Sequence, residues 1–143
     1  KMSLSFKYKS VKRPDGSLVK APMIPLTIFG KENIDTIGLL DSGADISAMS
    51  RDMAELLGLK LNKDVDFAFG IGGKVRSIQT NINISISQKH EQYSINLPVK
   101  IILDDYSFPL LLGRAGFFDE FVITFDQPDE KIVLKKTNRS KIY

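Results

Sequence analysis

The chain has 143 residues, of which 43% are hydrophobic and 26% charged, so it is long enough to bury the core of one globular domain. It contains no cysteine and one histidine, His90, which excludes disulfides, thiol nucleophiles and metal sites built from cysteine or histidine clusters. The net charge is +3, and a nucleic-acid-binding surface normally needs a denser basic patch than this chain offers.

No segment of the chain predicts a membrane-bound or secreted protein. No apolar run approaches the length that crosses a bilayer, and the charged, alternating start differs from a secretory signal peptide. Because the lack of cysteine fits a reducing compartment, we expect a cytoplasmic protein that associates with neither membranes nor nucleic acid. We also expect residues 1–143 to form a single domain, with a core over about 23–134, an N-terminal hairpin over 1–22 and a polar tail over 135–143.

The first third of the chain predicts short strands separated by turns. Apolar and polar residues alternate over 4–8, as in a strand with one solvated face. A Pro-Asp-Gly-Ser turn follows at 14–17, and strands are expected over 23–29 and 34–40. Short strands at such regular spacing indicate an all-β fold.

A short helix and a hairpin are expected next. Ser50 is a good N-cap, Asp52 would lie in the first turn where the helix dipole favours an acid, and Gly58 is a natural C-terminal stop. The segment 67–76 then predicts two strands joined by a tip of three glycines and an isoleucine at 70–73.

The remaining segments continue the β pattern. Isoleucines alternate with polar residues over 82–86, which predicts a half-buried strand, and a returning strand is expected over 93–103. The apolar run 109–113 is typical of a buried strand. A second short helix is expected over 114–121, and a final hairpin over 122–134.

Asp41 occupies an unusual place for an acid. It follows the apolar run Ile37-Gly38-Leu39-Leu40 and precedes Ser42, Gly43 and Ala44. Aspartate is disfavoured in strands and is rarely buried unless it is paired. Some interaction must therefore hold this carboxylate where the strand ends, and hydrolysis by paired carboxylates is a chemistry that needs such an arrangement.

Three motifs occur in a fixed order, and each has the local context that it needs. They are Leu39-Leu40-Asp41-Ser42-Gly43-Ala44-Asp45 at a strand end, Gly70-Ile71-Gly72-Gly73 at a hairpin tip, and Leu111-Leu112-Gly113-Arg114 between a strand and a helix. Each motif alone is weak. Together they resemble the retropepsin-type aspartic proteases, which include retroviral proteases, the DNA-damage-inducible proteases and prokaryotic relatives. The resemblance covers about residues 23–134.

This resemblance implies an all-β fold, a partly closed barrel of the retropepsin type with one or two short helices. It implies that Asp41 is catalytic and that Ser42 and Gly43 support its loop. Ser42 stands where threonine is commoner in the family, and it keeps the hydroxyl group. Ala44 and Asp45 would line the floor on which the substrate backbone lies.

The same resemblance assigns roles to two further motifs. The flap that closes over the substrate would be formed by Gly70, Ile71, Gly72 and Gly73. Arg114 would have a structural role, paired with Asp45 or another acid. The walls of the side-chain pockets would come from Ile46, Ile71, Val75 and Leu110.

The single copy of Asp-Ser-Gly predicts a homodimer. Peptide hydrolysis by this class needs two nearby carboxylates that share one proton, one acting as base toward water and the other as acid toward the scissile carbonyl. Asp41 of two chains would therefore meet on a two-fold axis. The substrate would be an extended peptide or an unfolded protein, with no cofactor and no metal.

Other interpretations stay open at this point. Asp41 could be an ordinary turn acid, and 70–73 a passive hairpin tip. The chain could also be a catalytically silent retropepsin-fold module that binds peptides or dimerises without cutting, or an enzyme restricted to unfolded or tagged clients or to self-processed forms. We favour the endopeptidase because Asp41, Ser42, Gly43 and the flap glycines are all present.

Overall fold

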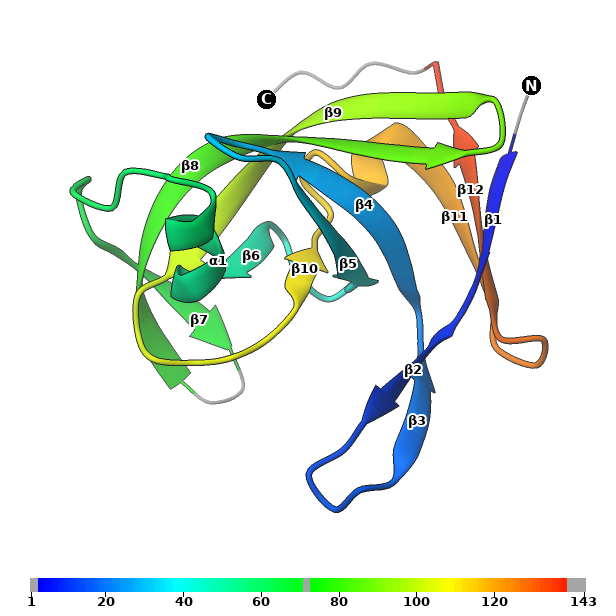
Figure 1. The fold of residues 1–143 in the computed structure, drawn as a ribbon, viewed down its shortest axis with the longest axis horizontal. Helices are drawn as coiled ribbons and strands as arrows, with labels where there is room; N and C mark the ends of the chain where they lie inside the picture. The colour runs from blue at the N-terminus through cyan, green and yellow to red at the C-terminus, as the bar shows by residue number, and fades with distance from the viewer. Residues whose placement is uncertain (1–2, 71–72, 139–143) are drawn as a thin grey trace.

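The computed structural model describes residues 3–70 and 73–138, and it is built almost entirely of β-strands (Figure 1). Its strands are β1 (Ser3–Lys7), β2 (Lys9–Lys12), β3 (Leu18–Ala21), β4 (Met23–Phe29), β5 (Ile34–Leu40), β6 (Ser47–Ser50), β7 (Asp66–Gly70), β8 (Gly73–Gln88), β9 (Glu91–Ile102), β10 (Leu110–Leu112), β11 (Phe121–Asp126) and β12 (Lys131–Lys136). The all-β prediction is confirmed.

Seven of these strands form a barrel with one extension. Their order is β4-β5-β10-β6-β9-β8-β7, and β4 also pairs with β8 through Thr27 to Phe29. The six strands from β4 to β8 therefore close on themselves, which leaves no free edge among them, while β7 extends β8 outside the barrel. Two of the pairs, β5 with β10 and β6 with β9, are parallel. The predicted barrel is present.

The longest strand joins the barrel to a projecting hairpin. The sequence predicted separate strands near 74–76 and 82–86, but β8 runs without a break from Gly73 to Gln88. Its first residues pair with β7, and its later residues pair with β9. After Gly73 the strand contains neither glycine nor proline, so nothing interrupts the ladder. The exposed His90 lies in the turn between β8 and β9.

A second sheet, in the order β1-β12-β11, packs beside the barrel. The predicted hairpin over 1–22 is shorter than expected, because only β2 and β3 form a hairpin, while β1 pairs with β12. The physical reason is burial. Leu4, opposite Leu134, and Phe6, opposite Ile132, are buried together with their partners, whereas pairing with the exposed β2 would leave their apolar faces in water.

The helices match the predictions in part. Helix α1 (Arg51–Leu56) is capped by Ser50, whose hydroxyl accepts a hydrogen bond from the Met53 amide, and Gly58 follows it with φ +73°. The helix predicted over 114–121 does not form; only a 3₁₀ turn, η1 (Phe118–Glu120), is present. Gly116 has φ +84°, which breaks a right-handed helix at that residue. No helix in the described ranges is long and apolar enough to span a bilayer.

Phe117 lies in the core, and we expect its truncation to lower the stability of the fold. Its ring is fully buried and lies 5.3 Å from the ring of Phe121. We expect Phe117→Ala to lower the free energy of unfolding by about 3–5 kcal/mol, because it leaves a cavity among close-packed neighbours. Phe69→Ala is the matched control, since Phe69 is 80% exposed on β7. Urea unfolding of both variants checks this, and equal losses would contradict it.

Candidate active site

Asp41 lies where β5 and β10 end side by side. The register aligns Leu40 with Leu112, and the Asp41 amide donates to the Leu112 carbonyl at 3.0 Å. The chain then turns, with the Ala44 amide donating to the Asp41 carbonyl at 3.1 Å. Asp41 is half-buried. The carboxylate is thus fixed at the rim of the barrel with its backbone tied on both sides.

Gly43 brings its amide to the Asp41 carboxylate. Its N–H donates to Asp41 Oδ1 at 3.0 Å, and a Cβ built on Gly43 would lie 3.3 Å from the same oxygen. A side chain here would therefore crowd the carboxylate. The donated hydrogen bond fixes the orientation of this carboxylate.

Arg114 ties this loop to the end of β10, but in a different way from the expected one. Its Nη1 donates to the Ser42 carbonyl at 2.7 Å. No ion pair found among the described residues joins Arg114 to Asp45, and the side chain is exposed rather than buried. The expected pairing with Asp45 is therefore wrong. The acceptor of the Arg114 side chain is the Ser42 backbone carbonyl, which the turn holds in place, and not a carboxylate.

The backbone after β10 reinforces the same loop. The Arg114 amide donates to the Ala44 carbonyl and the Ala115 amide to the Asp45 carbonyl, both at 2.9 Å. Gly113 is buried, and its amide donates to Ser47 Oγ at 2.9 Å. Sequence analysis missed Ser47, although a serine between two apolar residues at a strand start is a signal for such a buried hydrogen bond.

An open cleft lies over this loop. It is lined by Asp41, Gly43, Ala44 and Asp45 on the loop, by the described ends of the β7–β8 hairpin, Gly70 and Gly73, and by apolar side chains that include Ile46, Val75, Ile102 and Leu111. Ile46 and Val75 were predicted as pocket walls. Leu110 was also predicted, but it is buried in the core and the adjacent Leu111 faces the cleft, because side chains of successive strand residues alternate.

The segment predicted to form a flap lies at the end of the β7–β8 hairpin. Gly70 pairs with Gly73 at its end, and both line the cleft that contains Asp41. Ile71 and Gly72, also predicted for the flap, lie outside the described residues. Lys74 Nζ sits 4.4 Å from the centre of the Phe67 ring, and Lys100 Nζ donates to the Phe67 carbonyl at 3.4 Å.

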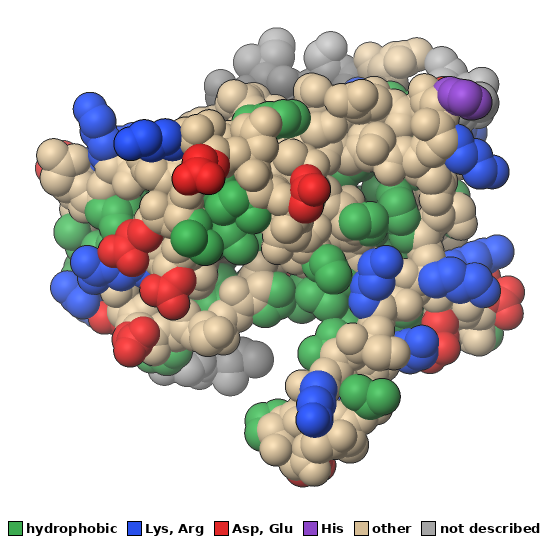
Figure 2. All heavy atoms as spheres, viewed as in Figure 1, with side chains coloured by type: hydrophobic (Ala, Val, Ile, Leu, Met, Phe, Trp, Pro, Cys, Tyr) green, Lys and Arg blue, Asp and Glu red, His purple; other side chains and the backbone are tan. Residues whose placement is uncertain are grey.

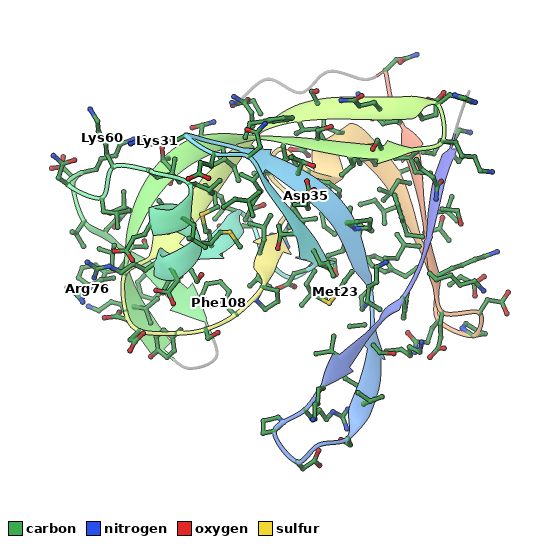
Figure 3. The ribbon with its side chains drawn as sticks, viewed as in Figure 1. Met23, Lys31, Asp35, Lys60, Arg76 and Phe108 are labelled. Atoms are coloured by element: carbon green, nitrogen blue, oxygen red, sulfur yellow. The ribbon has the colours of Figure 1, made fainter. Side chains whose placement is uncertain are left out.

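The loop between β9 and β10 forms the remaining wall, and Tyr106, Ser107 and Phe108 on it line the cleft. Figure 3 labels Phe108 on this loop. Sequence analysis missed these residues and Lys100. The loop is held by Arg76 on β8, whose guanidinium donates to the Asp104 carboxylate at 3.0 Å. The Arg76 amide and guanidinium both hydrogen-bond the charged carboxylate, which lowers the pKa of Asp104 below its ordinary value.

The described side chains do not gather into a metal site. No group of three or more histidine, aspartate and glutamate residues in these ranges lies close enough to hold an ion. The cleft brings a fixed carboxylate, Asp41, together with apolar side chains and a glycine-ended hairpin. A carboxylate so placed can exchange a proton with water or with a bound carbonyl.

Comparison with known proteins supports the fold. No family model matches the sequence, and no curated protein matches it. The crystal structure of a retropepsin-like aspartic protease from Rickettsia conorii is similar in structure, with a TM-score of 0.58, 18% sequence identity, and coverage of 93% of this chain and 91% of that chain. At such low identity the likeness establishes the fold, and this chain has a retropepsin-like fold.

The close approach of Gly113 to β6 predicts a specific steric effect. A Cβ at Gly113 would lie 2.5 Å from the Ile46 carbonyl carbon, so we expect Gly113→Ala to destabilise the fold by about 1–3 kcal/mol through overpacking against backbone. Gly70→Ala is the matched control, because a Cβ there meets nothing within 4 Å. Its effect should stay within about 0.5 kcal/mol. Chemical denaturation measures the free energy of unfolding of both variants. An equal loss in Gly113→Ala and Gly70→Ala would contradict the packing argument.

The Arg76–Asp104 contact predicts a pH-dependent contribution to stability. Because the folded-state pKa of Asp104 lies below 3.8, the contact stabilises the fold above that pH and is lost as the pH falls through the folded-state pKa. Asp104→Asn should therefore lower Tm at about pH 6, and the difference from wild type should close near pH 2. Asp105→Asn, at the next exposed carboxylate, is the control. A Tm difference that is constant with pH would contradict the prediction.

Proposed function

We propose that this protein is an aspartic endopeptidase that cuts extended peptides as a homodimer. The observation that carries the proposal is the setting of Asp41. It lies at the joined ends of β5 and β10, its carboxylate accepts the Gly43 amide, and it shares a cleft with the glycine-ended hairpin. The structurally similar protein from Rickettsia conorii is itself described as a retropepsin-like aspartic protease.

The second copy supplies the other half of the chemistry. The chain has one Asp-Ser-Gly motif, and the mechanism needs two carboxylates with one proton between them. The ionised Asp41 takes a proton from a water molecule while the oxygen of that water attacks the peptide carbonyl carbon. The protonated Asp41 of the other chain gives its proton to the carbonyl oxygen. The tetrahedral intermediate then breaks its C–N bond: the protonated Asp41 gives its proton to the leaving nitrogen, a hydroxyl of the intermediate gives a proton to the other Asp41, and one proton again remains on the pair.

The cleft fits an extended peptide. In such a complex the substrate backbone lies along the Ala44–Asp45 floor and adds a strand under the β7–β8 hairpin, which excludes water from the reacting bond. Ile46, Val75 and Leu111 line the space beside Asp41. We therefore expect apolar side chains of the substrate next to the scissile bond, where they would pack against these apolar residues.

Asp45 is the other carboxylate in the lining, and it gives a rival arrangement in which one chain carries both acids. The loop geometry favours Asp41 over Asp45. Among the described hydrogen bonds, the Gly43 amide donates to the Asp41 carboxylate and not to that of Asp45. A binding module without activity is the competing function. A binding module would use the same cleft without a second carboxylate. Peptide cleavage that depends on Asp41 therefore distinguishes the endopeptidase from the binding module.

The decisive test is cleavage of a diverse peptide library from about pH 3.5 to 7.5, with cut sites located by mass spectrometry. We expect cutting by the wild type, inhibition by a pepstatin-like compound, and complete loss in Asp41→Asn. Asp35→Asn, which removes an exposed acid earlier on β5, is the matched control and should stay active.

Analytical ultracentrifugation under the assay conditions completes this test. A dimer that binds peptides without cutting them would favour the binding module. Activity in a monomeric sample that is lost in Asp41→Asn and equally in Asp45→Asn would favour the rival arrangement. Activity that rises with the dimer fraction is the result expected for a site shared between two chains.

A further inference from the structure

Strands β2 and β3 form an arm that leaves the body of the molecule. We name residues 9–21 the basic arm. In the described part of the chain its two strands pair only with each other, and Figures 1 and 2 show it standing clear of the barrel. Every residue of the arm is exposed or only partly buried, and Leu18 is 67% exposed. An isolated two-stranded hairpin is marginal in water, so its apolar residues gain from a partner.

The arm is nevertheless a defined structure. Its turn is closed by the Arg13 amide donating to the Ser17 carbonyl at 2.8 Å and the Gly16 amide donating to the Arg13 carbonyl at 2.9 Å. Asp15 Oδ1 also accepts from both the amide and the hydroxyl of Ser17. A hairpin that is already ordered loses little conformational entropy when it docks.

Both ends of the arm are tied to the molecule, and one end lies beside the catalytic loop. The Leu40 amide donates to the Pro22 carbonyl at 3.0 Å. The arm therefore leaves the barrel at Pro22, beside the residue that precedes Asp41. Figure 3 shows Met23 at this junction. At the other end, the Tyr8 amide donates to the Glu130 carbonyl at 2.8 Å. These two anchors fix the direction in which the arm projects.

We propose that the basic arm docks on a second copy of this chain, across the two-fold axis of the catalytic dimer. This inference rests on the proposed function, in which two Asp41 carboxylates meet. If they lie about 3 Å apart and neighbouring strands about 4.8 Å apart, Pro22 lies within roughly 10 Å of the axis. Four strand residues span about 13 Å, so the arm is long enough to cross the axis and reach the partner.

Charge also points to the body of the partner as the docking surface. The arm holds four of the chain's 20 basic residues and one of its 17 acidic residues, so the rest of the chain holds 16 of each. The whole net charge of +3 therefore resides on the arm. Two arms placed against each other would repel, whereas an arm on the neutral body of the partner would not. Reciprocal docking of this kind is the isologous arrangement that two-fold symmetry requires.

Cross-linking between differently labelled chains tests the proposal. The chain has no cysteine, so Leu18→Cys gives one attachment site for a maleimide photo-cross-linker. Equal amounts of ¹⁴N- and ¹⁵N-labelled chains are mixed, and linked peptides are identified by mass spectrometry. Contact with the partner gives mixed-label products as abundant as same-label ones. Leu56→Cys is the matched control, because Leu56 on α1 is 66% exposed, and it should give same-label products only.

Each outcome decides the matter. Same-label products alone, or no products, from a sample that is dimeric and active would overturn the role of the arm and leave the proposed function standing. A chain that stays monomeric at every concentration while its Asp41 cuts peptides would overturn both the arm contact and the shared site. A dimer with mixed-label products but no cleavage would support the arm and contradict the endopeptidase.

A point variant gives an independent readout. Leu18→Asp should raise the dimer dissociation constant by at least about tenfold, because it places a charge where an apolar side chain is buried between chains. Its Tm as a monomer should not change, since Leu18 is exposed in the single chain, and activity should return as the enzyme concentration rises. Leu56→Asp is the control. An unchanged dissociation constant for Leu18→Asp would contradict the docking.

Discussion

The site depends on the parallel pairing of β5 with β10. Parallel strands end at the same edge of a sheet, so this one ladder places the residues after Leu40 beside the residues after Leu112. The hydrogen bond from the Asp41 amide to the Leu112 carbonyl extends the ladder by one position into the loop that contains Asp41. Arg114 can then reach the Ser42 carbonyl. Without this pairing the same side chains would be distant in space, and the turn that presents the Asp41 carboxylate would have no support from β10.

Local patterns in the sequence were enough to predict most of the elements that hold the site. Strands β4 and β5 were predicted with the bounds that the structure shows, because their alternation and their flanking turns are short-range features. The cap at Ser50 and the stop at Gly58 were confirmed for the same reason. Asp41 and the glycine-ended hairpin could be recognised as parts of one cleft only because the motifs resemble a known family, since their meeting depends on contacts between distant segments.

The errors arise where long-range contacts decide the outcome. Pairing of β1 with β12 joins the two ends of the chain, and no local pattern distinguishes it from a hairpin with β2. The helix expected over 114–121 does not form, because Gly116 has a positive φ. Arg114 meets a carbonyl instead of the expected acid, since a fixed turn offers an acceptor without the cost of orienting a second side chain. The choice between Leu110 and Leu111 for the cleft depends on strand register, which the apolar run itself does not reveal.

In the proposed dimer the two copies must not repel each other, and the placement of charge in the chain is compatible with that requirement. Identical bodies carry identical net charge, so any large value would oppose their approach. Here the body outside the basic arm is neutral overall, and the excess positive charge lies on a hairpin that projects away from it. Repulsion between the two arms then disfavours contact between arms, while each arm remains free to lie on the opposite body. In the proposed dimer, excess charge around Asp41 would weaken association, whereas the same charge on the arm would favour the arrangement in which each arm lies on the partner's body.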